Sequence, residues 1–116
     1  MLKQLSIYAE NKKGALQAMT NALYEAGINI WGSVTNDGAE YGINRMVVSD
    51  PDKAKEVLTE KGYLCRFVDV LAVEIEDKPG ALNTLLTALL DSNVNVDYTY
   101  PVSYTHLRAH ETDQYL

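Results

Sequence analysis

The chain contains two copies of one pattern, and this internal repeat limits the possible folds more than any other feature. The first copy begins at Leu5 with "LSIYAENKKGALQAMTNALYEAGINI", and the second begins at Leu71 with "LAVEIEDKPGALNTLLTALLDSNVNV". The two segments align without a gap. Among the identical residues, Lys12, Gly14, Ala15, Leu16, Ala22, Leu23 and Asn29 recur as Lys78, Gly80, Ala81, Leu82, Ala88, Leu89 and Asn95. Such a repeat predicts two copies of one structural unit.

Each copy has the pattern of a strand, a loop, a helix and a second strand. Apolar residues first alternate with polar ones, from Leu5 and from Leu71, as in a half-buried strand. They then recur at helical spacing, from Ala15 and from Leu82. Pro79 suits the first helical position, and Gly27 and Asn93 suit the left-handed backbone that ends a helix. The second strands are predicted at "INIWGSVT" and "VNVDYTY".

The first copy continues into a complete unit. "NDGAEYG" has the residues of a turn, and "INRMVVS" has those of a third strand. Asp50 with Pro51 predicts the start of a second helix that ends at Gly62, and "YLCRFVDV" predicts a last strand. The order βαββαβ predicts an α+β, ferredoxin-like fold, in which two helices cover one face of a four-stranded antiparallel sheet.

The second copy stops before it is complete. Its third strand should fall near residues 107–115, but "LRAHETDQY" has no strand pattern. We therefore expect a complete domain over residues 1–69 and a truncated strand-helix-strand copy over residues 70–101. A helix with half a sheet to cover leaves apolar surface exposed. We expect the truncated copy to be unstable alone, or to pair with the first copy or with another chain.

The last segment, residues 102–116, is predicted to be a non-native tail. Written back into codons, "VSYTHLRAHET" matches an adaptor of transposon-based sequencing libraries, read in frame. The repeat ends at the same place. His106, His110 and Glu111 would lie on one face of a helix there, as metal ligands do. Because these residues fall in the tail, we expect no native metal site and no cofactor.

Composition excludes several classes of function. The net charge is −6 at pH 7, whereas nucleic-acid binding needs clustered Lys and Arg. The chain has one cysteine, Cys65, so no disulfide within the chain is possible. It has no apolar run long enough for a membrane span and no signal-peptide pattern at its start. We expect a cytoplasmic protein that contacts neither nucleic acid nor membrane.

The repeated segments "ENKKGALQAMTNALYEAGINI" and "EDKPGALNTLLTALLDSNVNV" resemble the ACT domain family of small ligand-binding βαββαβ modules. Copy two carries the family's Lys-Pro-Gly-Ala-Leu motif, whereas copy one has Lys13 in place of the proline. The resemblance implies regulatory binding of a small molecule, usually an amino acid, where two modules pack side by side. It also implies ligand contacts from the first loop, the first helix and the second strand, and a homodimer formed by module pairing.

The residues at these positions suit an amino acid. The N–H groups at a helix N-terminus favour a carboxylate, and Asn side chains offer both a donor and an acceptor. Asp77 would take an ammonium group. The candidate ligand-binding residues are Asn11, Lys13, Gly14, Ala15, Leu16, Asn29 and Ile30 in the first copy, and Asp77, Pro79, Gly80, Ala81, Leu82 and Asn95 in the second.

Each candidate also has a purely structural interpretation. The glycines would relieve crowding in a tight loop, and Asn29 and Asn95 would shape the start of a strand. Asn11 and Asp77 would stabilise a helix start. Leu16 and Leu82 are expected to belong to the core.

No catalytic set is evident, because no histidine precedes the tail and the Ser and Thr residues lack a base. Three hypotheses follow. The chain is a non-enzymatic amino-acid-binding regulatory module, a regulatory fragment of an amino-acid-metabolising enzyme, or a dimerisation module without a ligand.

Overall fold

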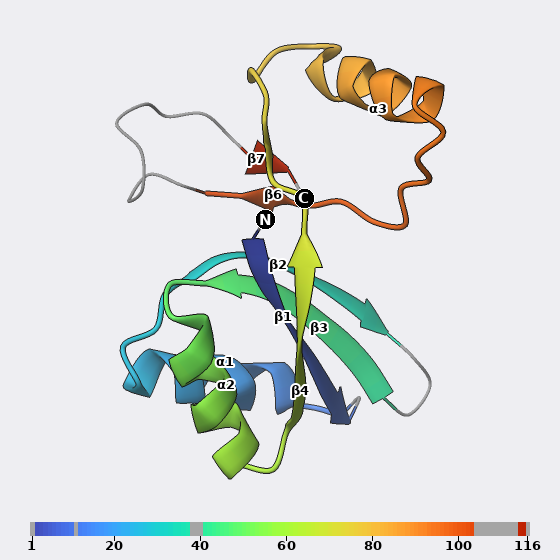
Figure 1. The fold of residues 1–116 in the computed structure, drawn as a ribbon. Coiled ribbons are helices and arrows are strands. Elements are labelled where there is room, and N and C mark those ends of the chain that lie inside the picture. Colours follow the sequence, from blue (N-terminus) through green and yellow to red (C-terminus); the bar gives the residue numbers. More distant parts are fainter. Residues whose placement is uncertain (1, 11, 38–40, 104–113, 116) are drawn as a thin grey trace. The chain divides into compact units, whose positions relative to one another are not determined.

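The computed structural model of the chain describes every residue except 1, 11, 38–40, 104–113 and 116 (Figure 1). The chain divides into two compact units, Met1–Val70 and Leu71–Leu116. The boundary between them follows directly after the last strand of the first repeat copy.

The first unit has the βαββαβ order that the sequence predicts. Its elements are β1 (Leu2–Glu10), α1 (Ala15–Glu25), β2 (Ile30–Asp37), β3 (Tyr41–Val48), α2 (Pro51–Glu60) and β4 (Leu64–Val70). The strands lie in the order β2-β3-β1-β4, and every neighbouring pair is antiparallel. Figure 1 shows α1 and α2 on the same face of this sheet. The predicted ferredoxin-like fold is confirmed for this unit.

Local sequence signals set the ends of these helices. The Asp50 carboxylate accepts a hydrogen bond of 3.2 Å from the Lys53 N–H, and Pro51 follows it as the first helical residue of α2. Gly27 and Gly62 have φ angles of 74° and 92° directly after the C-caps of α1 and α2. Both glycines therefore end their helices as predicted, because they accept the left-handed backbone without strain.

The core of the first unit lies between the sheet and the two helices. Leu5, Leu23 and Leu58 are fully buried there and come from β1, α1 and α2. The other buried members are Ile7, Met19, Ala22, Ile28, Met46, Val48, Ala54 and Cys65. Residues from both helices and three strands therefore form one cluster, which holds the loop between β1 and α1 on a rigid support.

Cys65 contributes a buried thiol to this core. Burial raises the pKa of the thiol above the ordinary value of 9.0, and this effect outweighs a hydrogen bond with Thr59 and the charge of Lys55. The folded protein thus binds the thiol proton more tightly than the unfolded chain does. The resulting stability is fully present below pH 9.0 and is lost as the pH rises through the raised folded pKa.

We therefore expect the free energy of unfolding to fall with pH above about 9 more steeply in the native protein than in Cys65→Ala. Urea titrations of both proteins between pH 7 and pH 10.5 would measure this difference. All other titratable groups are common to the two proteins, so the difference between the two profiles reports on the thiol. Parallel pH profiles for the two proteins would contradict the prediction.

The second unit has a helix and three very short strands. Its elements are β5 (Val73–Glu74), α3 (Ala81–Asp91), β6 (Pro101–Val102) and β7 (Gln114–Tyr115), and the strands lie in the order β5-β7-β6. The second strand predicted over residues 94–100 is wrong, because that segment has no strand and β6 follows it. A segment becomes a strand only where a neighbour pairs with it, and here each pairing covers two residues.

The structure also differs from the prediction for the end of the chain. Residues 107–115 were expected to carry no strand, yet β7 falls there and pairs with β5 and β6, in the central position that a third strand takes in this fold. The adaptor origin of residues 102–116 stays a prediction. His106, His110 and Glu111 lie outside the described residues.

Helix α3 reproduces the form of α1 but not its burial. Asn93 has a φ of 61° beyond its end, as predicted. Pro79 does not occupy the first helical position, because Gly80 is the N-cap and Ala81 begins the helix. No residue of α3 is buried, whereas Met19, Ala22 and Leu23 of α1 are. The same apolar pattern therefore has much less structure to pack against.

Candidate functional site

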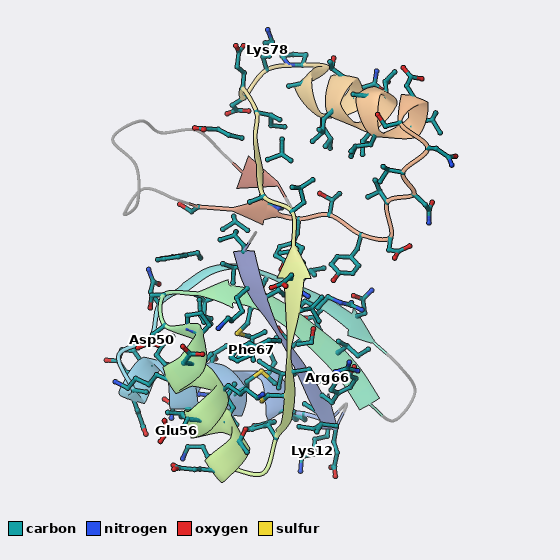
Figure 2. All side chains as sticks on the ribbon, in the orientation of Figure 1. Lys12, Asp50, Glu56, Arg66, Phe67 and Lys78 are labelled. Carbon is teal, nitrogen blue, oxygen red and sulfur yellow. The ribbon has the colours of Figure 1, made fainter. Side chains whose placement is uncertain are left out.

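A tight turn joins β1 to α1, and the second copy repeats it before α3. The Lys12 N–H donates to the Glu10 carbonyl over 3.0 Å, and the Ala15 N–H donates to the Lys12 carbonyl over 3.2 Å. Lys78 and Ala81 make the same two bonds with Glu76 and Lys78, also at 3.0 and 3.2 Å. Figure 2 labels Lys12 and Lys78 at these turns. Because the turn recurs in a unit with so little packing, its own sequence determines it.

The helix that follows each turn begins with a glycine in the left-handed conformation. Gly14 and Gly80 are the N-caps of α1 and α3, with φ angles of 82° and 87°. A Cβ at either position would meet no atom within 4 Å, so crowding is not the reason for glycine. The backbone angle is the reason. Among the described residues no side chain caps either helix, and neither first turn contains an acidic residue. Apart from the N–H groups of Ala15 and Ala81, which donate within the turns, the first-turn N–H groups are therefore available to an anion.

A groove of about 800 Å³ lies over the first of these turns. One wall comes from β1, the turn and the start of α1, where Tyr8, Ala9, Glu10, Lys12, Lys13, Gly14, Ala15 and Ala18 line it. The other wall consists of Lys61, Gly62, Tyr63 and Leu64, between α2 and β4. Sequence reasoning missed this second wall. It lies there because β1 pairs with β4 in the sheet, which places the end of β1 beside the start of β4, with Tyr8 opposite Leu64.

Positive charge predominates in this groove. The Lys12 ammonium lies 3.5 Å from the Glu10 carboxylate. Lys13 and Lys61 have no acidic partner among the residues that the structure describes. Together with the N-terminal end of the α1 dipole, these two side chains favour a carboxylate. Glu10 is the acidic group of the groove and suits an ammonium.

A smaller pocket of about 210 Å³ lies on the side of the same turn that faces β2 and β3. Its lining residues are Ala9, Glu10, Lys12, Ala15, Leu16, Met19, Thr35, Gly42 and Asn44. The prediction that Leu16 belongs to the core is wrong, because this residue is 49% exposed. Leu16 lies in the first turn of α1, and Gly42 of β3 offers no side chain against which it could pack.

The structure brings together only part of the predicted site. Lys13, Gly14 and Ala15 line the groove, and Leu16 lines the smaller pocket. Asn29 and Ile30 lie at the opposite end of the sheet, because Ile30 pairs with Val48 whereas the smaller pocket lies at Gly42. The backbone of Asn29 exchanges two hydrogen bonds of 2.9 Å with Ser49. Asn11 lies outside the described residues.

Five of the six second-copy candidates are in or near the loop before α3. Asp77, Pro79 and Gly80 are exposed there, and Ala81 and Leu82 are half-buried in the first turn of the helix. Asn95 is exposed, and its side-chain amide donates to the Asp97 carboxylate over 3.1 Å. Asn95 is thus bonded to a residue close in sequence, and it lies after the C-terminal end of α3, away from the loop that precedes this helix.

Two features are absent from the part of the chain that the structure describes. No group of three or more His, Cys, Asp or Glu side chains in that part of the chain could hold a metal ion. No helix found there is long and apolar enough to cross a membrane.

Comparison with known proteins identifies related sequences and folds. A family model described as an ACT domain pair matches residues 1–108. The crystal structure of protein BT0572 from Bacteroides thetaiotaomicron is 32% identical, with a TM-score of 0.85; the match covers 98% of this chain and 76% of that one. A comparison with curated proteins found no match.

Two regulatory subunits of aspartate kinase share the fold at lower identity. The ligand-free subunit from Thermus thermophilus is 15% identical with a TM-score of 0.73, over 97% of this chain and 79% of that one. The subunit from Thermus flavus is 17% identical with a TM-score of 0.61, over 99% and 82%.

Proposed function

Because the chain belongs to the ACT domain pair family, we propose that it is a non-catalytic regulatory module that binds an amino acid. The groove over the β1–α1 turn is the ligand site in this proposal. The observation that carries it is the uncapped start of α1, where Gly14 leaves first-turn N–H groups beside Lys13 and Lys61.

The groove matches both charged ends of an amino acid. The α-carboxylate lies against the first turn of α1, where backbone N–H groups and two lysines supply positive charge. The α-ammonium lies toward Glu10. Glu10 and the first N–H groups of α1 flank one short turn of the protein, which suits a ligand whose two charges are only a few ångströms apart. The uncapped turn at Gly80 offers the same backbone donors in the second copy.

We also propose that the chain acts as a cytoplasmic homodimer formed by module pairing. The first module supplies two walls of the groove. A second module packed beside it would cover the ligand and strengthen each polar contact by excluding water. Ligand binding would then stabilise the paired state, which is how a module without catalysis transmits a signal.

Two alternatives make different predictions. A regulatory fragment of an amino-acid-metabolising enzyme would bind an amino acid equally well but would alter activity only when joined to its catalytic part. A dimerisation module without a ligand would associate in the absence of any amino acid and would gain no stability from one.

A thermal-shift screen with the standard amino acids tests the proposal, followed by calorimetry on any that raise Tm. We expect one or two amino acids to raise Tm. The shift should be easily measurable, because a ligand at one hundred times its Kd adds about 2.7 kcal/mol of stability. Lys13→Gln should weaken the binding roughly fivefold, the scale of about 1 kcal/mol for an exposed charge pair.

The matched control is Lys53→Gln, which removes the same charge from an exposed residue of α2 that does not line the groove. It should leave the affinity unchanged. If no amino acid raises Tm while the chain still dimerises in analytical ultracentrifugation, the ligand-free dimerisation module is correct instead.

A further inference from the structure

We propose that Asn44 selects the side chain of the ligand, and that the ligand is an amino acid with a short side chain that ends in a hydroxyl or a carboxamide. This inference rests on the proposed function, because it assumes that an amino acid binds at the first turn of α1. It adds the smaller pocket beside that turn as the subsite for the side chain.

Asn44 is a buried polar residue in an apolar row. It lies on β3 with Met46 and Val48, all facing the helices, and it pairs with Ile7 of β1 and Thr35 of β2. Asn44 is only 4% exposed. Its Nδ2 donates to the Thr35 hydroxyl oxygen over 3.0 Å. Its Oδ1 is buried and has no hydrogen-bond partner among the described residues.

Packing alone does not explain this amide. A buried polar atom without a partner destabilises a fold, whereas an apolar residue of similar size at the same place would not. Leucine has the same branched shape and the same number of side-chain heavy atoms as asparagine, and it would continue the row formed by Met46 and Val48. An acceptor kept in such a position is expected where a ligand supplies the missing donor.

The pocket beneath α1 has the shape and chemistry for that donor. Ala9, Leu16 and Met19 form apolar walls, and Asn44 and Thr35 supply polar groups. Thr35 is exposed, so its hydroxyl proton remains available to a ligand acceptor. The pair thus presents one acceptor and one donor. A hydroxyl or a carboxamide satisfies both, whereas an aliphatic side chain satisfies neither and a carboxylate lacks the donor.

The position of the pocket connects it to the groove. Ala9, Glu10, Lys12 and Ala15 line both cavities. An amino acid whose carboxylate contacts the first turn of α1 can therefore direct its side chain past Ala15 into the pocket. The volume of about 210 Å³ limits that side chain to a short one.

Isosteric amino acids test the inference directly. Threonine and valine differ by a hydroxyl in place of a methyl group, and asparagine and leucine have the same branched shape and number of heavy atoms. Calorimetry on the native chain should show threonine or asparagine binding at least tenfold more tightly than its apolar counterpart, since a buried acceptor left unpaired costs about 1–3 kcal/mol. Asn44→Leu should reduce this ratio to near one.

The stability of the same variant separates this role from a structural one. If Asn44 serves selection, Asn44→Leu should keep or raise Tm, because it removes an unpaired buried acceptor. A residue kept for its bond to Thr35 would lower Tm when replaced. Asn36→Leu is the control, because Asn36 is exposed on the other face of β2 and should leave the ratio unchanged. Thr35→Val, at an exposed position, should also reduce the ratio if Asn44→Leu does not fold.

The outcomes for the two proposals are distinct. If valine binds as tightly as threonine, and leucine as tightly as asparagine, the selection by Asn44 is overturned and amino-acid binding stands. A preference that survives both Asn44→Leu and Thr35→Val has the same consequence. If none of the four amino acids nor any other binds, the proposed function fails, and this inference fails with it.

Discussion

Leu23→Ala is expected to lower the free energy of unfolding of the first unit by about 3–5 kcal/mol, the usual cost of truncating a fully buried leucine. Leu23 has no exposed surface and belongs to the core of the first unit. Its repeat counterpart, Leu89, also follows an alanine in its helix but is only half-buried, on a helix with no buried residue. Leu89→Ala should therefore lower the stability of the second unit by less than about 1.5 kcal/mol.

The single tryptophan makes this comparison measurable. Trp31 lies in β2, so its fluorescence in a urea titration reports on the first unit alone. Amide hydrogen exchange along α3 reports on the second unit. The two variants make the same chemical change at equivalent positions, so each serves as the control for the other. Equal losses would show that a partner buries α3 as fully as the first unit buries α1.

Gly14→Ala is expected to destabilise the first unit by about 1–2 kcal/mol, the cost of a left-handed backbone for a residue with a Cβ. The cost is conformational, because the added methyl group would meet no atom within 4 Å. The strain is relieved if the turn rotates, and rotation would turn the first N–H groups of α1 away from the groove. We therefore expect weaker binding of whichever amino acid the thermal-shift screen identifies.

Gly14→Asn is the matched control for this change. Asparagine tolerates the left-handed region, and Asn93 already adopts it in this chain with a φ of 61°. We expect Gly14→Asn to retain most of the stability and of the affinity. Urea titration and calorimetry on both variants would measure the two effects. Equal losses from alanine and asparagine would mean that the turn requires the absence of a side chain and not the left-handed angle.

Local signals were enough to predict the first unit. The order of its elements follows from the two periodicities, and the ends of its helices follow from single residues. Asp50 caps α2, and Gly27 and Gly62 end α1 and α2, as their sequence context predicts. These features depend on the backbone preference or the hydrogen bonding of one residue with its near neighbours, so they can be read from a short segment.

The candidate site was predictable only in part, because only some of its features are local. The turn that ends at Gly14 is local, and the repeat identified it. The opposite wall of the groove, at Lys61–Leu64, lies close to this turn because β1 pairs with β4. Predicting that wall requires knowing which strands are neighbours and therefore which loops lie side by side. Asn29 was expected beside the turn, but the register of β2 with β3 places it at the other end of the sheet.

The sequence by itself determined the repeat, the fold of its first copy, the two helix starts and the chemistry of the turn. Only the tertiary structure decided how deeply each copy is buried and which distant residues meet. Leu16 is half exposed, Asn44 is buried with an unpaired acceptor, and β7 lies between β5 and β6. Burial and strand pairing are properties of a residue together with partners far away in the chain. For this reason the same apolar pattern forms a core in α1 and leaves α3 without a buried residue.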